Sequence, residues 1–195
     1  MSSIQELGLT QLRDFYGLRT FIETGCFQGG GIAAALNAGF EDVYSCDIDP
    51  ASVEHCQNRF ADNDGVHLLA SESTMAITEF CRISQHPSLF WLDAHFPTYY
   101  GNEGADTAST RFPLPLELEI ISKRANIASD VIAFDDLRVI HSDDNPRWRD
   151  DEVPDYFVIE GLTLGALTSP FNATHEFQAI LAAEGIGLLT PRSKP

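Results

Sequence analysis

The most informative segment of this sequence reads Glu23-Thr24-Gly25-Cys26-Phe27-Gln28-Gly29-Gly30-Gly31. It follows an apolar run that predicts a β-strand, and it opens an alanine-rich stretch that predicts a helix. Glycines at such a junction allow a tight turn and let a ligand approach the backbone closely. The segment therefore indicates a ligand-binding turn, although a purely structural turn would need the same glycines.

Asp47 strengthens this interpretation. It ends the next predicted strand and lies twenty-two residues after Gly25. In doubly wound sheets, a carboxylate at that place accepts hydrogen bonds from the hydroxyls of a ribose. The turn and the carboxylate together predict an adenosine-containing ligand.

Short β-rich runs alternate with helical stretches along the chain, which is typical of parallel strands joined by crossover helices. We predict an α/β fold, with one domain over residues 1–195 and a doubly wound, mostly parallel sheet of seven strands. The expected strands are Thr20 to Glu23, Val43 to Asp47, Val66 to Leu69, Ser88 to Asp93, Asp130 to Asp135, Tyr156 to Ile159 and Ile186 to Thr190. The expected helices are Ile4 to Phe15, Gly30 to Ala38, Pro50 to Phe60, Ser73 to Ile83 and Leu114 to Ala125. Two long polar segments, Phe96 to Phe112 and His141 to Asp155, are predicted loops of the kind that often covers a site.

The helix after Pro113 has a clear apolar face. Leu114, Leu118 and Ile121 recur at helical spacing and should face the sheet. We expect Glu117 and Glu119, in the same helix, to be solvated.

Acidic residues end two further apolar runs. Asp93 ends one of them, with His95 two residues later, and Asp135 and Asp136 follow the other. Adjacent parallel strands would bring these side chains to one edge of the sheet, where open α/β sheets bind ligands. Three clustered carboxylates favour a hard divalent cation, most plausibly Mg²⁺, so Asp93, Asp135 and Asp136 are candidate metal ligands. The alternative is that Asp135 and Asp136 simply cap a following helix.

These patterns resemble the class I S-adenosylmethionine-dependent methyltransferases over nearly the whole chain. The first motif of that family has an acidic residue followed by spaced glycines, and Glu23, Gly25 and Gly29 match it. Phe27 replaces the frequent middle glycine. The resemblance implies a Rossmann-like methyltransferase fold with S-adenosylmethionine as cofactor.

The same resemblance implies a role for each cofactor-binding residue. Glu23 would lie near the methionine amino group, Asp47 would bind the ribose, and Glu72, after the third strand, would reach the adenine edge. An alternative for Glu72 is a helix-start carboxylate that the helix dipole favours.

The carboxylate set is similar to that of the macrocin-type metal-dependent O-methyltransferases. That family carries one Asp after the fourth strand and an Asp-Asp pair after the fifth, which Asp93, Asp135 and Asp136 match. It often has a second acid two residues beyond the first ligand as general base, and this chain has His95 there. This departure leaves the base role open, since a neutral imidazole also accepts a hydroxyl proton near neutral pH. Asp93 and His95 are the candidate catalytic residues. His95 as a fourth metal ligand is the alternative.

Composition narrows the function classes. Apolar residues make up 44% and charged residues 21% of the chain, as in ordinary globular proteins, and we expect a cytoplasmic location. The formal charge of −17 disfavours nucleic acid and anionic membranes as partners. The four cysteines show no Cys-x-x-Cys spacing, which predicts reduced, mostly buried thiols.

The sequence thus predicts methyl transfer from S-adenosylmethionine to a hydroxyl of a small-molecule acceptor, with assistance by Mg²⁺ and assembly into a homodimer as open questions. The alternatives are a non-catalytic relative that still binds the cofactor, a metal-dependent hydrolase, and a nicotinamide-dependent oxidoreductase.

Overall fold

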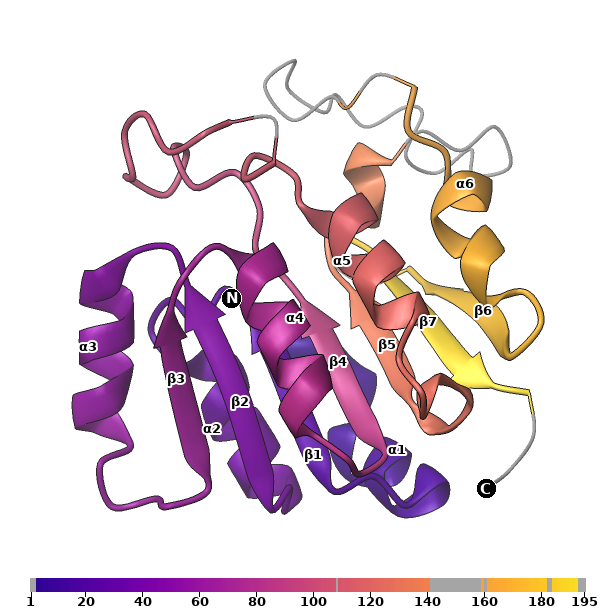
Figure 1. The fold of residues 1–195 in the computed structure, drawn as a ribbon, viewed down its shortest axis with the longest axis horizontal. Coiled ribbons are helices and arrows are strands. Elements are labelled where there is room, and N and C mark those ends of the chain that lie inside the picture. The colour runs from indigo at the N-terminus through magenta and orange to yellow at the C-terminus, as the bar shows by residue number, and fades with distance from the viewer. Residues whose placement is uncertain (1–2, 108, 141–158, 160, 182–183, 193–195) are drawn as a thin grey trace.

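The computed structural model describes residues 3–107, 109–140, 159, 161–181 and 184–192. Their strands form one seven-stranded sheet in the order β3-β2-β1-β4-β5-β7-β6 (Figure 1). The strands are β1 (Thr20–Thr24), β2 (Asp42–Asp47), β3 (Val66–Ala70), β4 (Ser88–Leu92), β5 (Val131–Phe134), β6 (His175–Ile180) and β7 (Ile186–Pro191). The predicted α/β fold with a seven-stranded, mostly parallel sheet is confirmed.

Strands β1 to β5 are parallel, whereas β7 runs antiparallel to both of its neighbours, β5 and β6. Consecutive crossovers lead from β1 through β2 to β3 in one direction and then from β4 to β5 in the other, so the strand order reverses between β1 and β4. Thr24 is paired with both Cys46 and Leu92, and therefore Asp47 and Asp93 flank the end of β1. Open sheets of this kind bind ligands at such a point.

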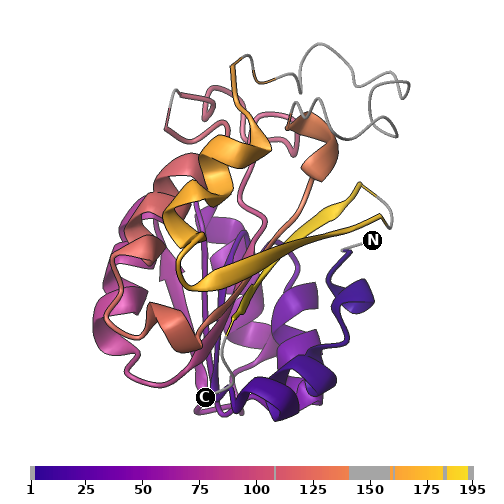
Figure 2. The same cartoon turned by 90° about the vertical axis from the view of Figure 1, so that its right-hand side faces the viewer.

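Helices cover both faces of the sheet (Figures 1 and 2). Apolar side chains of α1, α2 and α3 form one core with the first face, and those of α4, α5 and α6 form another with the second. The helices are α1 (Leu9–Tyr16), α2 (Gly30–Ala38), α3 (Pro50–Arg59), α4 (Ser73–Ile83), α5 (Leu114–Ser122) and α6 (Leu164–Thr168). Because both faces are covered, β1 and β4 are buried at every position.

Helix α3 begins with a well-formed cap beside the end of β2. Asp49 accepts hydrogen bonds from the backbone N–H groups of Ala51 and Ser52, at 3.1 Å each. Pro50 occupies the first helical position, where it needs no backbone N–H. The start of α3 is thereby fixed next to Asp47.

The leading helix predicted over Ile4 to Phe15 is broken in two. Ser3–Leu7 forms a 3₁₀ helix, and Gly8 then has a φ of 59° before α1 begins at Leu9. Glycine adopts this left-handed conformation without steric cost, so the chain changes direction there.

The sixth strand differs from the prediction. Tyr156 to Val158 of the expected strand lie outside the described residues, and Ile159 is not in a strand. The strand next to β7 is β6, which begins at His175. His175 is buried, and its Nε2 lies 2.9 Å from the carbonyl oxygen of Asp130 at the start of β5. An internal hydrogen bond thus explains a polar residue in the core.

The four cysteines carry free thiols, and all but Cys81 are buried, as predicted. No helix in the described part of the chain is long and apolar enough to cross a membrane.

Candidate cofactor and acceptor site

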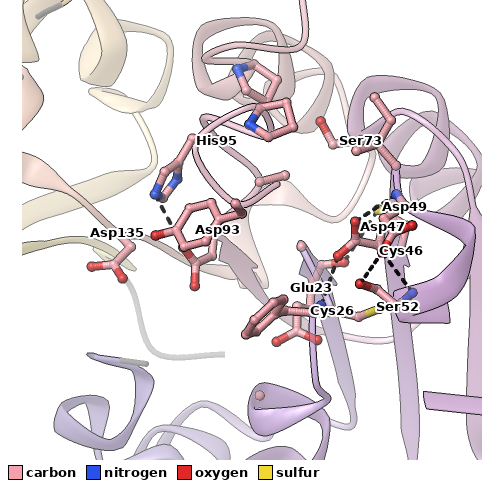
Figure 3. Close-up of a pocket in the computed structure, with 18 of the residues that line it drawn as sticks. Glu23, Cys26, Cys46, Asp47, Asp49, Ser52, Ser73, Asp93, His95 and Asp135 are labelled. Atoms are coloured by element: carbon pink, nitrogen blue, oxygen red, sulfur yellow. Dashed lines mark hydrogen bonds and ion pairs between the residues drawn. The ribbon is translucent and has the colours of Figure 1, made fainter. Parts of the chain in front are cut away.

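A cavity of about 580 Å³ lies at the carboxyl ends of the central strands, within the size range of small-molecule sites. Its lining runs from the turn after β1 to the residues that follow β4 and β5 (Figure 3). It includes Glu23, Gly25, Asp47, Glu72, Asp93, His95, Asp135 and Asp136. Of the site residues predicted from the sequence, Gly29 alone is absent from this lining.

Backbone hydrogen bonds hold the turn after β1 against the next strand. The N–H groups of Gly25 and Cys26 both donate to the carbonyl oxygen of Cys46, at 2.9 Å each. Gly25 has a φ of +85°, and a Cβ there would lie 2.7 Å from the carbonyl oxygen of Asp93. Glycine is therefore required where the end of β1 passes close to β4. Gly25 thus has a structural role, and the turn also borders the cavity.

Phe27 and Gly29 both have left-handed backbones. Gly29 directly precedes α2, and a Cβ there would lie 2.6 Å from the ring of Phe60 and 3.1 Å from Cys56 Sγ, so this glycine allows close packing against α3. Phe27 has a φ of 42°, which side chains rarely adopt, and its N–H donates to Asp47 Oδ2 at 2.9 Å. The residue that replaces a frequent glycine of the resembling family thus has a glycine-like backbone.

Glu23 lies buried beneath the turn, with 2% of its surface exposed. Ser45 Oγ donates to Glu23 Oε2 at 2.6 Å, and a Cβ on Gly31 would overlap the Glu23 carboxylate. Burial raises the pKa of Glu23 to about 8, although the hydrogen bond from Ser45 opposes this rise. A carboxyl in this environment favours its charged form once a cation lies beside it.

Asp47 and Glu72 both line the cavity, at the ends of the neighbouring strands β2 and β3. Asp47 Oδ1 accepts the N–H of Asp49 at 3.0 Å, while its other oxygen holds Phe27. Burial raises the Asp47 pKa despite these backbone hydrogen bonds. Glu72 precedes α4, is exposed, and makes no side-chain capping hydrogen bond. Glu72 thus occupies the position at the start of α4 that the helix-dipole alternative requires, and that alternative stays open.

His95 and the carboxylates form the opposite end. His95 Nε2 lies 2.7 Å from Asp136 Oδ2 and 3.6 Å from Asp93 Oδ1, and the His95 side chain is 7% exposed. Burial alone would lower the His95 pKa, but the hydrogen bond to Asp136 and the nearby carboxylates outweigh it, so the pKa is raised. Burial likewise opposes ionisation of Asp136, yet His95 and Arg138 lower its pKa. The arrangement favours an ion pair between His95 and Asp136.

Asp136 does not cap the short 3₁₀ helix that follows it, Leu137–Val139. Its φ of 58° turns the chain, and Arg138 Nε lies 2.8 Å from its Oδ1. Asp93 has a different environment: burial raises its pKa to about 7, with His95 opposing the rise. The pKa values of two neighbouring carboxyls are thus shifted in opposite directions by their surroundings.

Asp93, Asp135 and Asp136 border one end of the same cavity. Among the described residues, however, no three His, Cys, Asp or Glu side chains are arranged so that they could hold a metal ion. The Asp136 carboxylate is paired with His95 and Arg138 instead. The side chains as they stand do not fit Mg²⁺, and the magnesium site remains a prediction.

Glu117 is buried, contrary to the prediction, whereas Glu119 is exposed as expected. Leu114, Leu118 and Ile121 face the core as predicted, and Glu117 lies on the same stripe of α5. Glu117 lies three residues after Leu114 and four before Ile121, a spacing that predicts burial on the same helix face. We expected it to be solvated because it is charged.

The environment of Glu117 connects it with the site. Its pKa is raised to about 7 by burial, which the hydroxyls of Ser73 and Thr24 oppose by hydrogen bonding. Ser73 lines the cavity at the start of α4, and Thr24 Oγ1 accepts the N–H of Asp93 at 3.3 Å. Glu117 therefore contacts one residue that lines the cavity and one that holds the backbone of Asp93.

No protein-family model matches the chain, and no curated protein matches it in sequence. Solved structures do match it. The SAH-bound methyltransferase of Podospora anserina has 15% identity and a TM-score of 0.63, over 99% of this chain and 80% of that one. A proposed caffeoyl-CoA O-methyltransferase of Staphylococcus aureus has 9% identity and a TM-score of 0.57, over 98% and 84%. An rRNA methylase of Streptococcus thermophilus has 10% identity and a TM-score of 0.56, over 99% of each chain.

The chain has the Rossmann-like methyltransferase fold. These matches extend over nearly all of its length, so they concern the whole sheet and its helices. At sequence identities of 9–15%, these matches show that the chain shares the fold of the matched proteins. The resemblance to the macrocin-type enzymes remains a prediction.

Proposed function

We propose that this protein transfers a methyl group from S-adenosylmethionine to a hydroxyl of a small molecule. The observation that carries the proposal is one continuous cavity that borders the glycine turn at one end and the histidine and carboxylates at the other. The neighbours with the same fold, an SAH-bound methyltransferase among them, support methyl transfer in general. The Staphylococcus aureus protein is the neighbour that supports oxygen as the acceptor atom.

The cofactor would lie along the turn after β1. Glu23 is a buried carboxyl beneath that turn, suited to the ammonium group of the methionine part. Asp47 would accept the ribose hydroxyls, and Glu72 would reach the adenine. Bound there, S-adenosylmethionine supplies an electrophilic methyl group on a sulfonium ion.

The acceptor would lie at the other end, beside Asp93 and His95. When the methyl group moves from sulfur to oxygen, the acceptor hydroxyl must lose its proton. His95 already carries a proton in its ion pair with Asp136, so the carboxylate form of Asp93 would accept it. His95 is held by Asp136 at 2.7 Å, which fixes the orientation of its ring. Alignment of the acceptor by these fixed groups would lower the barrier further.

Assistance by Mg²⁺ is the less favoured form of this proposal. The ion would have to displace His95 and Arg138 from the Asp136 carboxylate. We expect turnover to persist in the presence of EDTA, and its abolition would favour the metal-assisted route.

Calorimetric titration with S-adenosylhomocysteine tests the cofactor assignment. Parallel titrations with NAD and ATP test whether the protein binds a different adenosine-containing ligand instead. We expect Asp47→Asn to weaken binding about tenfold to hundredfold, because the ribose loses a charged acceptor. Asp42→Asn, at the opposite end of β2, is the matched control and should bind normally. Equal affinities for both variants would contradict the ribose assignment.

A methyl-transfer assay on the same protein preparation distinguishes the non-catalytic alternative from the proposed function. It predicts tight binding of S-adenosylhomocysteine without methyl transfer to any acceptor in a library of hydroxylated small molecules. Transfer of label from methyl-labelled S-adenosylmethionine would exclude this alternative.

A further inference from the structure

Acidic side chains dominate the lining of the cavity. It has one arginine and one histidine, and its eight acidic residues are Glu23, Asp47, Asp49, Glu72, Asp93, Asp135, Asp136 and Glu184. The chain as a whole carries a formal charge of −17. Carboxylates in a concave, low-dielectric site strengthen one another's field, so an anionic guest is repelled and a cation is attracted.

At the acceptor end, acidic groups still exceed basic groups after the ion pairs within the site are counted. Asp136 is paired with His95 and Arg138, and Arg138 also lies 3.7 Å from Glu184. Asp93 and Asp135 add two further carboxyls. Carboxyls therefore outnumber the basic groups at this end.

Three exposed aromatic residues, one from the glycine turn and two from the loop after β4, lie close together beside the cavity. Phe27 is 54%, Tyr99 62% and Tyr100 57% exposed. The ring centroids of Phe27 and Tyr100 are 6.2 Å apart, and those of Tyr99 and Tyr100 are 5.3 Å apart. Phe27 and Tyr100 also line the cavity, so together they form an aromatic rim at its mouth.

The two rim residues come from different segments, the turn after β1 and the loop after β4. Phe27 has a left-handed backbone that a glycine would adopt without strain, and its ring is more than half exposed. Strain and exposure of this kind have a cost to stability and recur at binding sites. Aromatic faces beside carboxylates are the combination that recognises organic cations.

We propose that the acceptor is a ring-bearing organic cation, such as a phenolic amine, whose ring packs on Phe27 and Tyr100 while its ammonium group lies among the carboxylates. This inference rests on the proposed methyl transfer, because it takes the mouth of the cavity as the acceptor end. It adds the class of acceptor to that proposal.

Three probes test which charge on the acceptor the cavity prefers. All three have a phenol with a two-carbon side chain, so they differ mainly in the charge at its end. They are tyramine, which is cationic, tyrosol, which is neutral, and 4-hydroxyphenylacetate, which is anionic. Binding is measured calorimetrically on protein saturated with S-adenosylhomocysteine. We expect tyramine to bind about tenfold more tightly than tyrosol, and 4-hydroxyphenylacetate to bind most weakly.

The rim is tested by Phe27→Ala and Tyr100→Ala, each of which should weaken tyramine binding about threefold to thirtyfold. Phe15→Ala is the matched control, because Phe15 is also 54% exposed but does not line the cavity. It should leave tyramine binding unchanged.

Equal binding of tyramine and tyrosol would overturn the proposal, and so would preference for the anion, absence of tyramine binding, or indifference to both rim variants. A protein that fails to bind S-adenosylhomocysteine contradicts the proposed function instead, and that titration is done first. Competition of Mg²⁺ with tyramine is measured in addition, since a cation site that prefers the metal would also count against an amine acceptor.

Discussion

Glu23 has an unusual charge state in the protein without ligand. With a pKa of about 8 it is mostly protonated at neutral pH. The ammonium group of bound S-adenosylhomocysteine would favour the carboxylate, so binding near pH 7 should release a proton and tighten as the pH rises toward 8. Calorimetry in buffers of different ionisation enthalpy measures this proton directly. Glu23→Gln should bind more weakly and without the proton, and a wild-type binding heat that is the same in every buffer would contradict the assignment.

Glu117 predicts a pH dependence of stability. Its pKa is about 7 in the folded protein and 4.5 in the reference state, so folding favours its protonated form. The stabilisation is complete below pH 4.5 and is lost as the pH rises through about 7, at up to ~1.4 kcal/mol per pH unit. Glu117→Gln should flatten the free energy of unfolding across this window, measured by denaturant titration at several pH values.

Glu119→Gln is the control for this experiment, because Glu119 is exposed on the same helix and pairs with Lys123 at the surface. It should leave the pH profile unchanged. A Glu117→Gln variant with the profile of the wild type would show that the buried carboxyl is not the titrating group.

The sequence predicted which side chains meet at the cavity but not what each of them contacts. Strand ends identify Asp47, Asp93 and Asp136 as neighbours, because parallel strands share an edge. The pairing of Asp136 with His95 and Arg138 depends on a left-handed backbone at an aspartate, which no local pattern predicts. For Glu117 the indications conflicted: its helical spacing predicted a buried side chain, whereas its charge predicted a solvent-exposed one.

The start of α2 offers a prediction at the level of the element. A Cβ on Gly31 would overlap the Glu23 carboxylate, whereas a Cβ on Gly30 would meet nothing within 4 Å. Gly31→Ala should therefore displace Glu23 and weaken S-adenosylhomocysteine binding at least about tenfold, because the buried carboxyl would lose its position. Gly30→Ala should leave Glu23 in place and be as stable or slightly more stable, because its Cβ meets nothing and alanine favours a helix. Calorimetry and thermal unfolding of both variants make this comparison, and equal behaviour of the two would contradict it.

The elements themselves were predicted with uneven success. Helices α2 and α4 begin and end as predicted, since each follows directly on a strand-end turn. The sequence analysis missed strand β6 for two reasons. Buried and exposed residues alternate only weakly along it. It also pairs antiparallel with β7, whereas alternating strands and helices predict parallel pairs. Gly8 interrupted an otherwise apolar-periodic leading segment in the same way that single glycines often end helices.

Net charge gives a prediction for the whole molecule. With a formal charge of −17, the folded chain repels itself, and salt should raise its melting temperature by screening. NaCl and MgCl₂ at matched ionic strength should act alike, since the described carboxylates form no metal site. A larger rise with MgCl₂ that Asp135→Asn abolishes would instead demonstrate bound Mg²⁺.

The position of β7 has a consequence for the order in which the chain can fold during synthesis. Strand β7 is made after β6, yet it lies between β5 and β6 and is the strand through which β6 joins the sheet. Until β7 has left the ribosome, the backbone groups along one side of β5 lack their partner strand, and β6 has nothing to pair with. The parallel half, with β1 and its glycine turn, has by then already been synthesised. The emerging chain thus exposes a sheet edge that could pair with other chains until β7 covers it.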